Sequence, residues 1–204
     1  GNLEKSTGPL NTELVLVRDA YGNVSSKKVV KDALVKSETQ YVYDVSNRLE
    51  KVVTSAHTAS PKTTEYGYFL AGLLKRIKDP LNQLTTFEYD SVGQISKKTN
   101  PLEKVWTFKH DSDGNLSEEV DPNGNLKTFF YDDSNRLVKK VLPDDLIEIF
   151  YDSKGALQSA RTNTSEIAVH YDENDRIKDA VAQGRGARQD LPKTQISYTY
   201  NSRG

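Results

Sequence analysis

One short pattern recurs along the 204 residues and constrains the fold more than any other feature. A large apolar residue stands two before a Tyr, and Asp usually follows the Tyr. Four residues after the Tyr comes Gly, Asn or Asp, and two residues after that an apolar residue. Counted between the Gly, Asn or Asp positions from Gly1 to Gly204, the spacings are 21, 25, 25, 21, 21, 21, 20, 20 and 29 residues. A fixed period of this length predicts supersecondary units that each pack on their neighbours.

The turn chemistry of each unit is visible in the residue types. Gly, Asn and Asp tolerate the left-handed backbone that a tight hairpin turn needs. The Asp after the Tyr is suited to accept hydrogen bonds from turn amides. We therefore predict a structural role, without catalysis, for the repeat residues. They are Tyr43, Asp44, Tyr68, Tyr89, Asp90, His110, Asp111, Gly114, Tyr131, Asp132, Tyr151, Asp152, Gly155, Tyr171, Asp172 and Tyr200.

Apolar and polar residues alternate before each Tyr, as in a half-buried antiparallel strand. Ile147, Ile149 and Tyr151 share one face in this way. A second turn, often with Pro at its second place, lies midway in each repeat, as at 79–82. The pattern predicts an all-β antiparallel meander of about 16–18 strands, two per repeat. Residues 1–204 are expected to form a single array of about nine repeats of 20–29 residues, with the extra residues of the longer repeats at the Pro turn, as at 54–62 and 182–193.

The Tyr-Asp-x-x-Gly/Asn-x-Leu phrase at this spacing resembles the RHS/YD-repeat family, which includes bacterial polymorphic toxins, wall-associated proteins, toxin-complex subunits and teneurins. The resemblance covers essentially the whole chain. It implies a curved or spiralling β-sheet that is part of a hollow shell, with this chain a fragment of a larger protein. The implied function is a structural shell segment that encapsulates or displays a toxin or effector domain. The alternative is an adhesion or glycan- or protein-binding scaffold at the cell surface.

Composition limits the other classes of function. The net charge of −1 gives no support for nucleic-acid binding, and no apolar run is long enough for a membrane helix. The chain has no Cys, and its three histidines have no metal-site spacing. The segment 111–115 lacks the Gly and Glu positions of an EF-hand loop, and the carboxylate pairs 132–133 and 144–145 are interpreted as solvated turns. We expect no enzyme activity, no cofactor and no metal.

Two features could instead contact a partner. A column of cations four residues after the turn position contains Lys5, Lys51, Arg76, Lys97 and Lys139, although a solvated sheet face is the more usual explanation. The insertion 183–189 carries Arg185 and Arg188, but most such loops are only surface loops. The aromatic face is a third surface, through which the chain could self-associate or hold a glycan. The expected partners are the rest of the parent shell and an enclosed effector domain, in a secreted or cell-surface protein of bacterial type.

Overall fold

The computed structural model describes residues 3–8, 11–190 and 192–200, and the chain divides into two compact units, Gly1–Lys104 and Val105–Gly204. Gly1, Gly204, Pro9, Leu10 and Asn201 of the repeat pattern lie outside the described residues. The first unit contains β1 (Leu3–Gly8), β2 (Thr12–Arg18), β3 (Val24–Lys31), β4 (Leu34–Tyr43), β5 (Leu49–Thr54), β6 (Lys62–Tyr68), β7 (Leu74–Lys78), β8 (Leu84–Tyr89) and β9 (Ile95–Thr99). The second contains β10 (Val105–His110), β11 (Leu116–Val120), β12 (Leu126–Tyr131), β13 (Leu137–Val141), β14 (Leu146–Tyr151), β15 (Leu157–Arg161), β16 (Ser165–Tyr171), β17 (Ile177–Gly184) and β18 (Thr194–Ser197).

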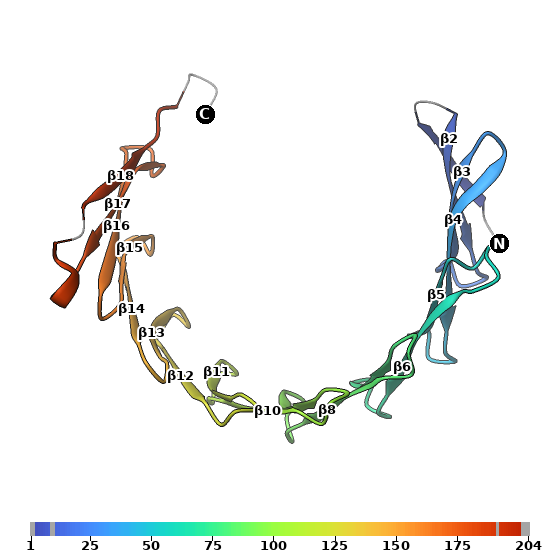
Figure 1. Ribbon diagram of the computed structural model, residues 1–204, viewed down its shortest axis with the longest axis horizontal. Coiled ribbons are helices and arrows are strands. Elements are labelled where there is room, and N and C mark those ends of the chain that lie inside the picture. The colour runs from blue at the N-terminus through green and yellow to red at the C-terminus, as the bar shows by residue number, and fades with distance from the viewer. Residues whose placement is uncertain (1–2, 9–10, 191, 201–204) are drawn as a thin grey trace. The chain divides into compact units, whose positions relative to one another are not determined.

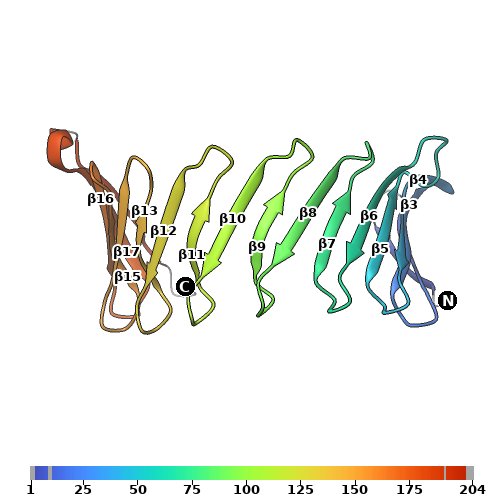
Figure 2. The same ribbon diagram turned by 90° about the horizontal axis from the view of Figure 1, so that it is seen from below.

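Each unit is an antiparallel meander in which every strand pairs with the next one along the chain. Within a unit the Tyr-Asp turns therefore gather at one edge of the sheet and the Pro turns at the other (Figures 1 and 2). The predicted all-β class is confirmed. Among the described residues the only helical element is a single 3-10 turn, Gly186–Arg188.

The sheet of each unit is one layer thick, and no second layer covers either of its faces (Figure 1). Among the described residues only Val181, Ser26 and Glu38 are buried. No described side chain is fully buried. The apolar side chains are instead half-covered by neighbours on the same face, which is how cross-strand pairs stabilise a sheet. No helix in the described part of the chain is long and apolar enough to cross a membrane.

The longer repeats place their extra residues in more than one way. Residues 55–61 form a loop between β5 and β6, as predicted for the Pro-turn side. In the repeat before it, the extra residues lengthen β3 and β4, and the turn is short, with Asp32 and Ala33 at positive φ. The insertion is also partly strand, because β17 runs to Gly184, which lies opposite Ser165 of β16. The loop expected at 182–193 therefore begins later than predicted, since backbone pairing continues through its first residues.

Candidate functional site: the Tyr-Asp turns

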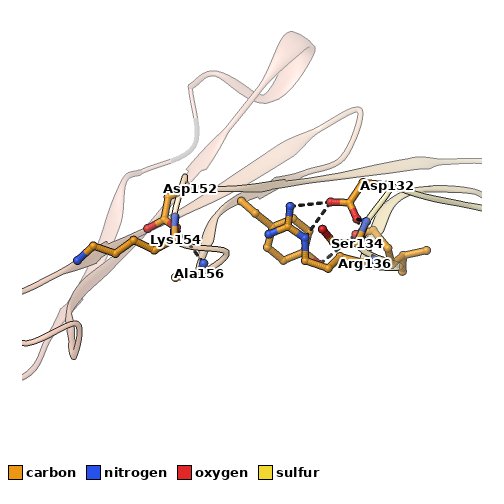
Figure 3. A network of polar contacts seen from close by, with 8 residues as sticks. Asp132, Ser134, Arg136, Asp152, Lys154 and Ala156 are labelled. Carbon is orange, nitrogen blue, oxygen red and sulfur yellow. Dashed lines mark hydrogen bonds and ion pairs between the residues drawn. The ribbon is translucent and has the colours of Figure 1, made fainter.

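Each Tyr-Asp turn is closed by its Asp side chain, and Asp132 shows the arrangement (Figure 3). One Asp132 carboxylate oxygen accepts hydrogen bonds from the Ser134 amide at 2.9 Å and the Arg136 amide at 3.0 Å. The Asn135 amide donates to the Asp132 carbonyl at 2.9 Å, and Asn135 has φ of 57°. The same pair of amide bonds occurs at Asp19, Asp44, Asp90, Asp111, Asp152 and Asp172. The carboxylate is thus engaged by backbone amides and is part of the turn.

The residue in the Tyr slot sits at a β-bulge. Between Phe130 and Tyr131 the register with β13 shifts by one residue, so two residues of one strand face one of the other. The same shift occurs at the slots filled by Arg18, Tyr43, Tyr68, Tyr89, His110, Tyr151 and Tyr171. The bulge follows from the left-handed turn residue. A type I turn that is followed by a residue in the left-handed conformation commonly ends in a β-bulge.

The Tyr hydroxyl joins its hairpin to the one before it. β11 and β12 pair only from Glu118 to Val120, so the two strands separate toward the Tyr-turn edge. The Tyr131 hydroxyl spans this opening and donates to the Leu116 carbonyl at 3.0 Å. The hydroxyls of Tyr43, Tyr68, Tyr89, Tyr151, Tyr171 and Tyr200 donate in the same way to the carbonyls of Val24, Leu49, Leu74, Leu137, Leu157 and Ile177.

A second link between hairpins runs through an Arg in three of the turns. The Arg136 guanidinium pairs with Asp132 at 2.7 Å and lies 4.5 Å from the centre of the Tyr151 ring in the next hairpin. Arg48 links Asp44 to Tyr68, and Arg176 links Asp172 to Tyr200, in the same way. A cation over a Tyr face is an attractive contact. Where Asn replaces this Arg, as at Asn115, its amide donates to Asn135 of the next turn at 2.9 Å.

His110, like Arg18, fills a Tyr slot without being a Tyr. Its ring has no hydroxyl, and its Nδ1 is buried without a hydrogen-bond partner among the described residues. The Asp111 that follows still closes its turn through the Asp113 and Asn115 amides. The His therefore keeps the turn and lacks the hydroxyl that the Tyr residues in this slot use.

The electrostatics of the turns agree with their geometry. The Arg136 side chain and amide hold the pKa of Asp132 below its ordinary value, and Arg48 does the same for the pKa of Asp44. Burial raises the pKa of Tyr131, and the charge of Asp111 raises it further. The network is therefore built for an ionised Asp and a neutral Tyr.

The two faces of each sheet differ in chemistry. One face holds the residues in the Tyr slots and the large apolar residues two before them. The other face holds cross-strand ion pairs, such as Glu88 with Lys97 at 2.8 Å and Lys109 with Glu118 at 2.7 Å. The column of cations named from the sequence lies in this second face and is not a free basic stripe. Lys5 pairs with Glu13, Lys51 with Glu65 and Lys97 with Glu88, while Lys139 lies over Phe130 and Arg76 lies beside Gly67.

The remaining predicted residues are placed apart from one another. Arg185 donates from its guanidinium to the Thr162 carbonyl and from its amide to the Thr164 carbonyl, so it fastens the insertion to the neighbouring turn. Arg188 is exposed in the 3-10 turn. Asp145 accepts from the amides of Leu146 and Asn163, so it also links two turns. No group of three or more His, Asp or Glu residues in the described ranges could hold a metal ion.

Sequence reasoning missed a parallel device at the Pro turns. Asp79 accepts from the Leu81 and Gln83 amides at 2.8 Å each, and Asn100 and Asp121 do the same in their turns. Asn82, Glu103 and Gly124 follow with positive φ. The signal was present in the Asp or Asn before Pro80, Pro101 and Pro122, which repeats the spacing of the Tyr-Asp turns.

Bulged hairpins tied in series within single-layer sheets define a tandem β-hairpin repeat protein. The RHS Repeat family model matches residues 89–126 and 110–146. These residues match RHS repeats, and the resemblance drawn from the sequence is confirmed. No curated protein sequence matches the chain.

Solved structures share the fold at low identity. The crystal structure of TcdB2-TccC3 aligns with a TM-score of 0.76 and 15% identity over 100% of this chain and 12% of that one. The Photorhabdus luminescens Tc holotoxin pore aligns with a TM-score of 0.59 and 16% identity over 94% of this chain and 11% of that one. The chain thus spans about an eighth of the length of the structures it matches.

Proposed function

We propose that the chain is a wall segment of an RHS-type shell, a single array over residues 1–204, whose parent protein encloses or displays a toxin or effector domain. The observation that carries the proposal is the sheet itself, one layer thick with two unlike faces. A sheet without a core of its own suits a wall, because its stability comes from neighbouring repeats. The matched structures, which include a Tc holotoxin pore, make the toxin context the most direct one.

The chemistry of the two faces suggests which one meets the cargo. Aromatic side chains are largely apolar, and half-exposed ones on this face, such as Phe87 and Phe108, can hold an unfolded chain without sequence preference. The opposite face carries most of the ion pairs between neighbouring strands, such as Glu148 with Arg161 at 2.8 Å. We assign the aromatic face to the inside and the ion-paired face to the outside. The parent would be secreted or exposed at the cell surface, and the segment itself non-enzymatic.

A glycan-binding scaffold fits the same face less well. Sugars bind aromatic residues through a free ring face and through hydroxyl hydrogen bonds. Here the Tyr68 and Tyr151 rings are covered by Arg48 and Arg136, and their hydroxyls already donate to backbone carbonyls. The groups that a sugar would use are therefore occupied by contacts between repeats.

Protection of the cargo tests the proposal in the parent protein. The parent chain, expressed with its effector domain, is digested with a non-specific protease, and cleavage of the effector is followed over time. Enclosure predicts an effector that resists cleavage far longer than the same domain expressed alone. An effector cut at the same rate in both forms would contradict enclosure and leave display as the function. In the isolated segment, binding of an unfolded fluorescent polypeptide should fall in the double variant Tyr89→Ser, Tyr131→Ser and not in Glu88→Gln, which alters the ion-paired face.

A further inference from the structure

The Tyr-Asp turns of the two units differ in the residues at their outermost point, which are hydrophobic in one unit and charged in the other. We call the two residues between the Asp position and the left-handed residue the tip of a turn. In the unit Gly1–Lys104 the tips are 20–21, 45–46, 70–71 and 91–92. None of them contains a charge, and each presents one large hydrophobic side chain to solvent. These side chains are Tyr21, Val45, Leu70 and Val92, with exposures of 84%, 107%, 108% and 78%.

The tips of the unit Val105–Gly204 have the reverse composition. They are 112–113, 133–134, 153–154 and 173–174. Each contains one charged residue, and none contains a large hydrophobic one. All eight tips serve the same kind of turn, so turn formation does not explain the difference. Turns favour Gly, Pro, Asn, Asp and Ser, so the turn itself does not require a Leu or Val at its tip.

The four hydrophobic tips belong to one continuous row. The side chains of Asn23 and Asn47 hydrogen-bond to each other between the first two turns. Arg48 donates to the Phe69 carbonyl between the second and third, and the Phe69 ring meets the Tyr89 ring edge-on at 6.1 Å before the fourth. Successive tips are two strands apart, so they lie at least about 10 Å from each other, which is the spacing of two paired strands. They lie farther apart than that where adjacent hairpins separate at this edge, since β5 pairs with β6 only from Lys51 to Thr54. The row therefore presents one hydrophobic side chain per hairpin along the sheet edge.

We propose that this row is a self-association surface, which binds the same row of a second copy of this chain around a two-fold axis. The axis passes between the tips of Val45 and Leu70. It brings Val45 of each copy to Leu70 of the other, and Tyr21 of each copy to Val92 of the other. All four tips meet at once because both rows have the same spacing. A partner without hairpins at this period would meet only one or two of them.

Charge supports a protein partner over a lipid surface. The arginines nearest to the tips are already paired, Arg18 with Glu4 at 3.1 Å and Arg48 with Asp44 at 2.7 Å. No like charges face each other when two uncharged rows meet, so association does not depend on screening by salt. A two-fold contact also closes on itself, so the species that forms is a dimer and not a fibre. The inference is independent of the proposed enclosing role, because it uses the turn edge and not the aromatic face.

Sedimentation equilibrium of the 204-residue chain over a wide concentration range tests the proposal. The expected result is a reversible monomer–dimer equilibrium that changes little between low and high salt. Leu70→Ser should weaken the dimer by about tenfold or more for each Leu70 lost, from the hydrophobic burial of one such side chain. The dimer contains two of them. Asp133→Ser changes a tip of the other unit and should leave the equilibrium unchanged.

Several outcomes would overturn the proposal. These are a chain that stays monomeric at every concentration, an association that Leu70→Ser leaves intact, or species that grow without limit. Loss of association in Tyr89→Ser with Tyr131→Ser, but not in Leu70→Ser, would assign it to the aromatic face instead. Binding to phosphatidylcholine vesicles that Leu70→Ser abolishes, with no dimer in solution, would show that the tips enter lipid. Far-UV circular dichroism confirms that each variant is folded, since Leu70 is exposed and its replacement costs the monomer little.

Discussion

Removing one Tyr-slot hydroxyl should measure how much its hydrogen bond to the preceding hairpin contributes to the free energy of unfolding. In Tyr131→Phe the ring and its packing remain, while the 3.0 Å hydrogen bond to the Leu116 carbonyl is lost. That carbonyl lies where β11 and β12 have already separated, so no backbone amide of the paired segment Glu118–Val120 can replace the donor. The change is therefore confined to the link between two hairpins.

The expected cost follows from the position of the acceptor. A neutral hydrogen bond contributes about 0.5–1.5 kcal/mol net, and a fully buried acceptor left without a donor costs about 1–3 kcal/mol. Leu116 is half-buried, so water can reach its carbonyl and the lower figure applies. We expect Tyr131→Phe to lower the free energy of unfolding by about 1 kcal/mol.

Urea unfolding followed by far-UV circular dichroism measures this difference through the shift in the transition midpoint. The matched control is Tyr66→Phe, which removes the same atom from the residue two before a Tyr slot and should change the free energy of unfolding by less than about 0.5 kcal/mol. Equal effects of the two substitutions, or no effect of Tyr131→Phe, would show that the hydroxyl does not hold the hairpins together.

The other predictions concern the turn and its ionisation. Gly114→Val should destabilise by about 1 kcal/mol or more, because φ of 88° is strained for a β-branched residue, whereas Gly114→Asn should be milder since Asn135 adopts φ of 57° at the same turn position. Thermal unfolding of both variants checks this, and equal losses would contradict it. The lowered pKa of Asp132 means that its contribution to stability is present above the unfolded pKa of about 3.9 and is lost as the pH falls through the folded value. In Asp132→Asn the free energy of unfolding should therefore fall less steeply below about pH 4 than in the unsubstituted chain. The same dependence on pH in both chains would contradict this. The raised pKa of Tyr131 has the opposite sign, so its contribution is present below about pH 10 and is lost as the pH rises through the folded value. Tyr131→Phe should reduce the alkaline loss of stability, and a profile identical to that of the unsubstituted chain would refute the role of the neutral hydroxyl.

The strands and turns could be predicted from the sequence alone, because each is determined by the residue types within one repeat. Gly114 and Asn135 marked left-handed turn positions by residue type, and both have positive φ. The alternation around Tyr131 and Tyr151 located the strands, since a strand face repeats every second residue. Eighteen strands form within the residues that the structure describes, at the upper end of the predicted range.

The links between hairpins could not be predicted in this way. The hydroxyl of Tyr131 reaches Leu116 only because the two strands separate at the turn edge, which depends on the bulge and on the short pairing of β11 with β12. The anchoring of Arg185 to Thr162 likewise depends on how far β17 extends. Both are contacts between neighbouring hairpins, and the residue pattern of one repeat does not specify them.

The direction of the Tyr hydroxyl bond has a consequence for synthesis of the chain. Every such bond runs from a later hairpin to a carbonyl of the hairpin before it, as from Tyr151 to Leu137 and from Tyr171 to Leu157. A hairpin leaving the ribosome therefore finds its acceptor already in place. Contacts between adjacent repeats close only short loops, so no step waits for a distant segment. The sheet can therefore form one hairpin at a time in the order of translation. Each new hairpin pairs with the last strand already formed and donates its Tyr hydroxyl bond to it.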